Sequence, residues 1–271
     1  MISKKMMLVL IASGMGIGMS HGAISTSYSN MGNMSASVGA LTNSLTVAKG
    51  DVVVMVGATN KKRSANKLTF TSSAGAVTDL SADAQLGNDP NPNSYLSYIT
   101  IGTAGTYDFI GTTDSLGMTA TLGTYVLSAD SGMIELADSN AKRYSGLAPA
   151  ASLSITNFMS WGSNPNAADY DGIVTVGVGS SLRGTLSNTA SVGGFNLDID
   201  KSGKRLAGYS DRTGSGNVKH VWDITNAHAT NSESGGITGA TFAEVIPEPA
   251  TLGILLSGGL AMLFVRRRFM L

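Results

Sequence analysis

The chain has 271 residues, of which 42% are hydrophobic and 13% are charged, and it contains 34 glycines and no cysteine. The hydrophobic fraction is sufficient for a packed core, which excludes an intrinsically disordered chain. The lack of cysteine excludes disulfides, thiolate metal sites and a cysteine nucleophile. All acidic residues except Glu248 lie within 24–246, whereas basic residues are also placed at both ends of the chain. The mildly acidic stretch between those ends predicts no nucleic-acid partner.

The first 22 residues have the pattern of a secretory signal peptide. Lys4 and Lys5 form a short basic region, and an apolar run follows from Met6 to Met19. Small residues then offer a cleavage site after Gly22 or Ala23. A buried N-terminal helix is the alternative, but the glycines within the run disfavour it. We therefore predict a cleaved signal peptide over 1–22 and an exported protein.

A second apolar segment lies near the C-terminus. The chain carries no charge from Ala250 to Val265, and Arg266, Arg267 and Arg268 follow directly. As a helix that rises about 1.5 Å per residue, this segment is somewhat shorter than the hydrocarbon core of about 30 Å, which arginine snorkelling and local thinning can accommodate. Positive residues stay on the cytoplasmic side of a membrane, so the body of the protein is predicted to lie outside.

The residues before this segment carry a family resemblance. Pro247, Glu248 and Pro249, followed by the apolar span and the arginine cluster, resemble a PEP-CTERM sorting signal over 246–271; Ile246 stands where that family more often has valine. The resemblance implies a bacterial protein that is recognised by an exosortase, an integral-membrane cysteine transpeptidase. It further implies that the tail is removed and that the protein passes to the cell envelope or extracellular matrix. A plain C-terminal membrane anchor is the alternative.

The body between these ends reads as a succession of short strands. "DVVVMVGA" at 51–58 is typical of a strand buried on both faces, and Val174, Val176 and Val178 are predicted to share one face of another strand. The further segments with strand patterns are 67–73, 95–101, 106–111, 118–128, 195–200, 205–210, 218–225 and 241–245. Turn-forming residues separate them, and no body segment has a convincing helical period.

These patterns predict an all-β body over 23–245, built as an antiparallel β-sandwich or jelly roll. The weakest point for a division into two domains is "LAPAAS" at 147–152. "LSAD" occurs at 80–83 and again at 127–130, which is too little to predict repeats.

Residues for catalysis or metal binding are few. His220 and His228 could meet a carboxylate such as Asp223, but no nucleophile elbow and no helical histidine pair accompany them, and ordinary surface histidines are the better interpretation. A pair of carboxylates for glycoside cleavage remains open, because their separation is a tertiary property. Asp198 to Gly203 resembles the start of a calcium loop, yet a hairpin turn with left-handed Gly203 is favoured. The oxygen-rich stretch 164–172 lacks a nearby lysine and is the somewhat better cation candidate, yet we predict no cofactor and no metal site.

Sugar recognition commonly uses an aromatic ring with polar neighbours. Trp161 and Tyr170 lie in a polar loop and are the candidate glycan contacts, although for Trp161 a covering role at the end of the sandwich is the favoured interpretation. Trp222 is predicted to face a core. The basic loop 60–67 is interpreted as a solvated hairpin tip rather than a contact for an anionic polysaccharide.

Together these observations predict an exported cell-surface or extracellular-matrix protein, such as a biofilm component, with a structural or adhesive role and no enzymatic activity. The expected partners are an exosortase-type transpeptidase, extracellular polysaccharide and, before processing, the membrane. A secreted glycan-binding module is the alternative function, and a glycan-active enzyme is a third.

Overall fold

In the computed structural model, the described residues are 24–34, 39–59, 68–81, 94–113, 119–130, 133–159, 170–190, 195–212, 218–226 and 228–245. Their regular secondary structure consists of β-strands, and no helix occurs within these ranges. The strands form four sheets in which every described pair is antiparallel. The predicted all-β class with antiparallel sheets is therefore confirmed.

The first eight strands form one sandwich-like unit, called unit 1. They are β1 (Ile24–Met34), β2 (Gly39–Val47), β3 (Val52–Thr59), β4 (Leu68–Ser72), β5 (Thr78–Asp79), β6 (Ser94–Thr100), β7 (Gly105–Thr113) and β8 (Ala120–Ala129). Five strands make the inner sheet in the order β1-β8-β3-β6-β5, and three make the outer sheet in the order β2-β7-β4.

The other eight strands form unit 2 with the same connectivity. They are β9 (Met133–Leu147), β10 (Ser152–Met159), β11 (Tyr170–Ser181), β12 (Thr185–Ala190), β13 (Asn196–Asp200), β14 (Arg205–Arg212), β15 (Val218–Thr225) and β16 (Glu233–Val245). The inner sheet has the order β13-β14-β11-β16-β9 and the outer sheet the order β10-β15-β12. If β1 is matched with β9, β2 with β10 and so on to β8 with β16, the two strand orders are identical.

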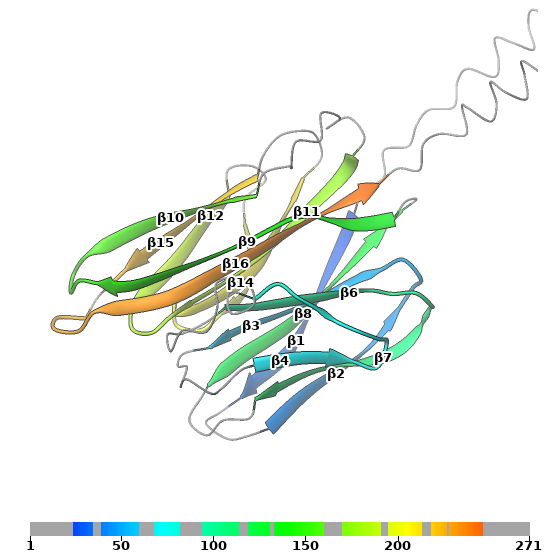
Figure 1. Ribbon diagram of the computed structural model, residues 1–271, viewed down its shortest axis with the longest axis horizontal. Coiled ribbons are helices and arrows are strands. Elements are labelled where there is room, and N and C mark those ends of the chain that lie inside the picture. Colours follow the sequence, from blue (N-terminus) through cyan, green and yellow to red (C-terminus); the bar gives the residue numbers. More distant parts are fainter. Residues whose placement is uncertain are drawn as a thin grey trace, which may run out of the picture.

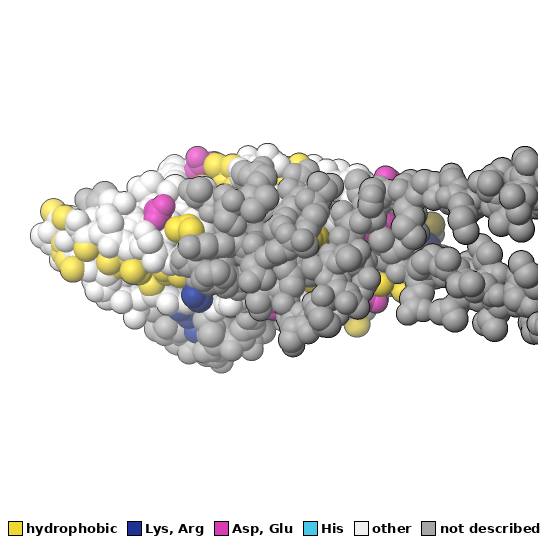
Figure 2. Space-filling view, turned by 90° about the horizontal axis from the view of Figure 1, so that it is seen from above, with side chains coloured by type: hydrophobic (Ala, Val, Ile, Leu, Met, Phe, Trp, Pro, Cys, Tyr) yellow, Lys and Arg dark blue, Asp and Glu magenta, His cyan; other side chains and the backbone are white. Residues whose placement is uncertain are grey.

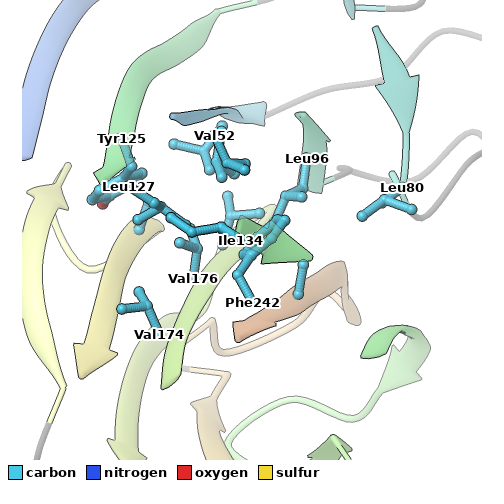
Figure 3. Close-up of a cluster of buried hydrophobic side chains, with 14 of the residues drawn as sticks. Val52, Leu80, Leu96, Tyr125, Leu127, Ile134, Val174, Val176 and Phe242 are labelled. Carbon is cyan, nitrogen blue, oxygen red and sulfur yellow. The ribbon is translucent and has the colours of Figure 1, made fainter. Parts of the chain in front are cut away.

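The four sheets lie in layers, with the outer sheets on opposite sides of the molecule and the inner sheets facing each other (Figure 1). A hydrophobic cluster fills each of the three spaces between layers. The central cluster joins the two units and contains Val54, Leu96 and Tyr125 from unit 1 with Val176 and Phe242 from unit 2 (Figure 3). Since burial of each large apolar side chain contributes about 1.5–3 kcal/mol, this shared core holds the two units together as one body.

β3 shows why a strand of an inner sheet is a continuous run of hydrophobic residues in the sequence. Every residue of this strand is buried, because Val52, Val54 and Val56 face the central cluster while Val53 and Met55 face the core of unit 1. The predicted burial of this strand on both faces is confirmed. The central cluster also contains Val174, Val176 and Val178, so the prediction that they share one face is likewise confirmed.

The match between the two units also holds for individual residues at equivalent positions in the inner sheets. Val54 on β3 is paired with Tyr98 on β6, and Val176 on β11 is paired with Tyr209 on β14. Aligned on these pairs, "VVVMVGA" at 52–58 matches "VTVGVGS" at 174–180, with valine at three alternate positions and then glycine. The spacing between matched residues varies along the chain because the loops differ in length, so no fixed sequence period exists.

The two units are arranged about an approximate two-fold axis. Tyr125 on β8 contacts Tyr209 on β14, with ring centroids 5.9 Å apart, and Tyr98 on β6 contacts Phe242 on β16 at 5.4 Å. If each strand is replaced by its match in the other unit, β8 and β14 become β16 and β6, so the first contacting strand pair becomes the second. The inner sheets are thus packed face to face in a nearly symmetric way.

The division into two units and several of the strands were not predicted from the sequence. Unit 1 passes into unit 2 between β8 and β9, whereas the weak point considered at 147–152 lies at the turn between β9 and β10. The two copies of "LSAD" are not at matched positions, since one follows β5 and the other ends β8. Strands β1, β2, β9, β10 and β12 were not among the predicted segments, because polar residues, chiefly serine, threonine and asparagine, interrupt their hydrophobic alternation, and the two-residue β5 was not predicted either.

Candidate functional site

The two ends of the described body lie at the same pole of the molecule. Ile24, the first residue of β1, is paired with Ala129 at the end of β8. Val245, the last residue of β16, is paired with Met133 at the start of β9. Ile24 and Val245 are therefore both held next to the short connection between the units. The chain continues from Val245 directly into the segment that resembles a sorting signal.

The predicted terminal signals themselves lie outside the described residues. This applies to the signal peptide over 1–22, to Pro247, Glu248 and Pro249, and to Arg266, Arg267 and Arg268. Among the residues that are described, no helix is long and apolar enough to cross a membrane.

The candidate glycan contacts are placed only in part. Trp161 and the loop 160–169 lie outside the described residues, as does the basic loop 60–67. The backbone of Tyr170 begins β11 opposite Val245, at the pole where β16 ends, but its side chain is not described. Trp222 is 1% exposed in the core of unit 2, as predicted.

A cluster of three tyrosines and one aspartate lies where the inner sheets meet along one flank. Tyr28 on β1 and Tyr125 on β8 are cross-strand partners with ring centroids 5.1 Å apart, and Tyr209 of unit 2 packs edge-on against Tyr125. Asp198 reaches this cluster from β13, where the ladder with β14 skips it between Leu197 and Ile199. Such a bulge re-aims a side chain, and here it brings a carboxylate towards the phenols of the other unit.

The pKa values in this cluster are shifted mainly because its acidic groups are partly buried. Burial, with the Asp198 charge as a second cause, raises the pKa of Tyr28 to about 12. The same two causes raise the pKa of Tyr125 well above its ordinary value. Burial also raises the pKa of Asp198, and its contact with the Tyr125 hydroxyl partly offsets this rise. The phenols of Tyr28 and Tyr125 therefore remain neutral at physiological pH, and the edge-on packing of Tyr209 on Tyr125 joins the two units here.

The calcium-like stretch forms a hairpin turn between β13 and β14. Gly203 has a φ of 64° and Ser202 a φ of 56°, both in the left-handed region. Asp200 Oδ1 accepts a hydrogen bond of 2.8 Å from the Gly203 amide, which uses the carboxylate to close the turn. The favoured hairpin interpretation is confirmed. Within the described ranges, no three histidine, aspartate or glutamate side chains gather as metal ligands do.

A buried carboxylate that the sequence did not indicate organises the opposite end of unit 2. Glu233 is 0% exposed, and its oxygens accept hydrogen bonds from the amides of Leu182, Arg183 and Gly184 at 2.6–2.8 Å and from Ser181 Oγ at 2.7 Å. Burial raises the pKa of the neighbouring Tyr144 hydroxyl, which lies 3.5 Å from Glu233 Oε1. Because the carboxylate is fully occupied by donors of the β11–β12 turn, its role is to fix that turn.

The candidate histidine–carboxylate contact does not form between the described side chains. His228 accepts hydrogen bonds through Nδ1 from the amides of Thr230 and Asn231, at 3.3 and 3.2 Å. Asp223 instead accepts a hydrogen bond from Ser154 on the outer sheet. His220 lies in β15, and its side chain is not described.

Neither a protein-family model nor a curated protein sequence matches this chain.

Proposed function

We propose that this chain is an exported bacterial cell-surface or extracellular-matrix protein with a structural or adhesive role. In this proposal the segment 246–271 is a sorting signal that an exosortase-type transpeptidase reads, and the body is delivered after removal of the tail. We also infer that each unit is a jelly roll, since seven of its eight antiparallel strands follow that topology, with inner order 1-8-3-6 and outer order 2-7-4, while the fifth strand extends the inner sheet beside strand 6.

The sequence of the tail carries the proposal. Pro247, Glu248 and Pro249 precede an apolar span, and Arg266 to Arg268 follow it. The two prolines fix φ near −65° and keep the intervening residue extended, so Glu248 would be presented as a single charge on a stiff segment. A plain anchor needs only the apolar span and the positive cluster, whereas an enzyme that reads the segment needs the triplet as well.

The fold supports a role of the body as a display module. The end of β16 and the start of β1 share one pole, so a tail that follows Val245 would hold the molecule by that pole. The pole contributed by the β9–β10 and β15–β16 connections would then point away from the attachment point (Figure 1). A cysteine-free body with three hydrophobic layers also remains folded in an oxidising compartment without disulfides.

The test is replacement of Pro247, Glu248 and Pro249 by alanine in the native host. We expect the triple variant to accumulate in the membrane fraction with an intact tail, whereas the wild type is released and lacks Arg266 to Leu271 by intact-mass measurement. Thr251→Ala, just beyond the triplet, is the matched control and is expected to be processed normally. Release of the triple variant at the wild-type level would contradict exosortase sorting and would favour a plain anchor or linker.

A further inference from the structure

The inner sheet of unit 2 carries a row of four residues with an arginine at each end. Arg205 on β14 is the register partner of Ser180 on β11. On the other side of Ser180, its partner is Gly236 on β16, and the partner of Gly236 is Arg143 on β9. Directly opposed residues of neighbouring strands point to the same side of a sheet, so the four positions share one face.

This row lies on the face that meets unit 1, just beyond the hydrophobic contact between the units. Ala207, two residues after Arg205, and Val178, two residues before Ser180, both belong to the central cluster. Side chains alternate along a strand, so residues two positions apart share a face. The neighbouring row also contains Thr238, whose hydroxyl is hydrogen-bonded to unit 1. The arginine row therefore lies between the central cluster and the β11–β12 turn.

Arg205 and Ser180 place two buried donors side by side without an acceptor. Ser180 is 0% exposed, and neither its Oγ nor the solvent-shielded Nε of Arg205 has a hydrogen-bond partner within the described part of the chain. The Ser181 amide donates to the Lys204 carbonyl, which makes the next pair, Ser180 with Arg205, a non-hydrogen-bonded pair. In such a pair the side chains lie close, with Cα atoms about 4.5 Å apart. Because buried polar groups are almost always hydrogen-bonded, this pair lacks an acceptor that the described residues do not supply.

The charge around Arg205 indicates that this acceptor is an anion. Burial lowers the pKa of Arg205, and no ion pair with a described carboxylate offsets the loss of water. The carboxylates of Asp200 and Glu233 are already used, the first by its own hairpin turn and the second by the β11–β12 turn. Lys201 and Lys204 of the adjacent hairpin are exposed and add further positive charge. Most of the Lys and Arg atoms that are visible on the described surface in Figure 2 lie together in one area.

We propose that Arg205 and Ser180 bind an oxyanion group, that is a carboxylate, sulfate or phosphate, and that Arg143 adds positive charge from the other end of the row. The planar guanidinium donates to two oxygens of such a group, and the Ser180 hydroxyl donates to one of them. A neutral ligand would leave the charge of Arg205 uncompensated.

The row lies towards the pole that, in the proposed function, points away from the attachment point. An acidic sugar unit of an extracellular polysaccharide and free inorganic sulfate or phosphate are the two sources of an oxyanion there. The site itself follows from the geometry of unit 2, whereas an acidic sugar as its ligand rests on the proposed matrix role.

The test measures the melting temperature of the mature protein with increasing sodium glucuronate, sulfate or phosphate, balanced with chloride to constant ionic strength. Glucose serves as the neutral sugar. We expect a saturable rise for the wild type with an oxyanion and none with glucose, since a ligand that binds only the folded state stabilises it. A rise with glucuronate identifies an acidic sugar as the source, and a rise with sulfate or phosphate alone identifies an inorganic ion; both support the site.

Two variants and one control assign this response to the row. Arg205→Gln should weaken binding at least about tenfold, and Ser180→Ala at least about threefold, because Arg205 supplies charge and several donors whereas Ser180 supplies a single donor. Lys49→Gln removes an exposed charge from unit 1 and should respond like the wild type.

The melting temperatures in chloride alone separate binding from a structural role. Neither variant should melt below the wild type there, because neither side chain has a hydrogen bond within the described part of the chain to lose. Lower melting temperatures of both variants in chloride would overturn the proposal, as would an equal and unsaturable rise in all four proteins, which is a general salt effect. Neither result bears on sorting, because tail removal is measured separately by intact mass.

Discussion

Ser94 Oγ and Thr238 Oγ1 lie 2.7 Å apart and form a buried hydrogen bond between the two units. Ser94 begins β6 and Thr238 lies in β16, in inner sheets that meet mainly through hydrophobic side chains. Both residues are 0% exposed, so each hydroxyl depends on the other unit for its partner. This contact fixes the register of one inner sheet on the other, which hydrophobic packing alone leaves less specific.

We expect Ser94→Ala to lower the free energy of unfolding by about 1–2 kcal/mol, because the buried Thr238 hydroxyl then keeps only its longer hydrogen bond, of 3.4 Å, to the backbone carbonyl of residue 94. The double variant with Thr238→Val removes both polar groups, and its loss should be smaller than the sum of the single losses by about 1 kcal/mol. Urea unfolding of the four proteins of this cycle measures that coupling. Strict additivity would show that the contact does not couple the units.

Gly179→Ala is expected to destabilise the protein by about 2 kcal/mol, as overpacking of a core does. A Cβ atom at this position would lie 2.6 Å from Cζ3 of Trp222, a rigid indole packed against β11. Gly39→Ala is the matched control in β2, since no described atom lies within 4 Å of the added methyl group. Thermal unfolding of both variants checks this, and equal melting temperatures would contradict the close packing of Trp222 on Gly179.

Glu233→Gln should cost about 3 kcal/mol of stability. Each carboxylate oxygen of Glu233 accepts at least one backbone amide, so the NH₂ group of glutamine must face an N–H donor in either orientation. Glu135→Gln on the exposed face of β9 removes the same charge without such donors and should change stability by less than about 0.5 kcal/mol. Denaturant unfolding distinguishes the two variants, and a neutral Glu233→Gln would show that the turn holds without the carboxylate.

The tyrosine cluster predicts a loss of stability at alkaline pH. Because the pKa of Tyr28 is raised to about 12 in the folded protein, the folded state retains its proton where the unfolded state has released it. The contribution of Tyr28 is therefore complete below its ordinary pKa of 10 and is lost as the pH rises from 10 to about 12. The difference between the ultraviolet titrations of the wild type and Tyr28→Phe reports this pKa. Asp198→Asn should lower it but leave it above 10, since burial is the larger cause, and an unchanged value would exclude an effect of the Asp198 charge.

The amino-acid pattern by itself determined the all-β class and the strands with strong hydrophobic signals. "VVVMVGA" and "IVTVGVG" could be recognised as buried strands because β-branched residues occupy them without interruption. The turn at Gly203 and the burial of Trp222 were likewise predictable, since both follow from local chemistry and alternation. Strands such as "ISTSYSNM" were not, because a strand that presents mainly hydroxyls is held by its neighbours rather than by its own hydrophobic face.

Only the tertiary structure decided which strands are neighbours, and that determines every candidate site in the body. Asp108 and Asp223 look like isolated acids in the sequence, and only the fold shows that each lies in the middle strand of an outer sheet. Asp198 meets Tyr28 and Tyr125 because a bulge in β13 and the packing of the two inner sheets bring distant segments together. Strand pairing depends on contacts between residues far apart in the chain, so local patterns contain the composition of such sites but not their geometry.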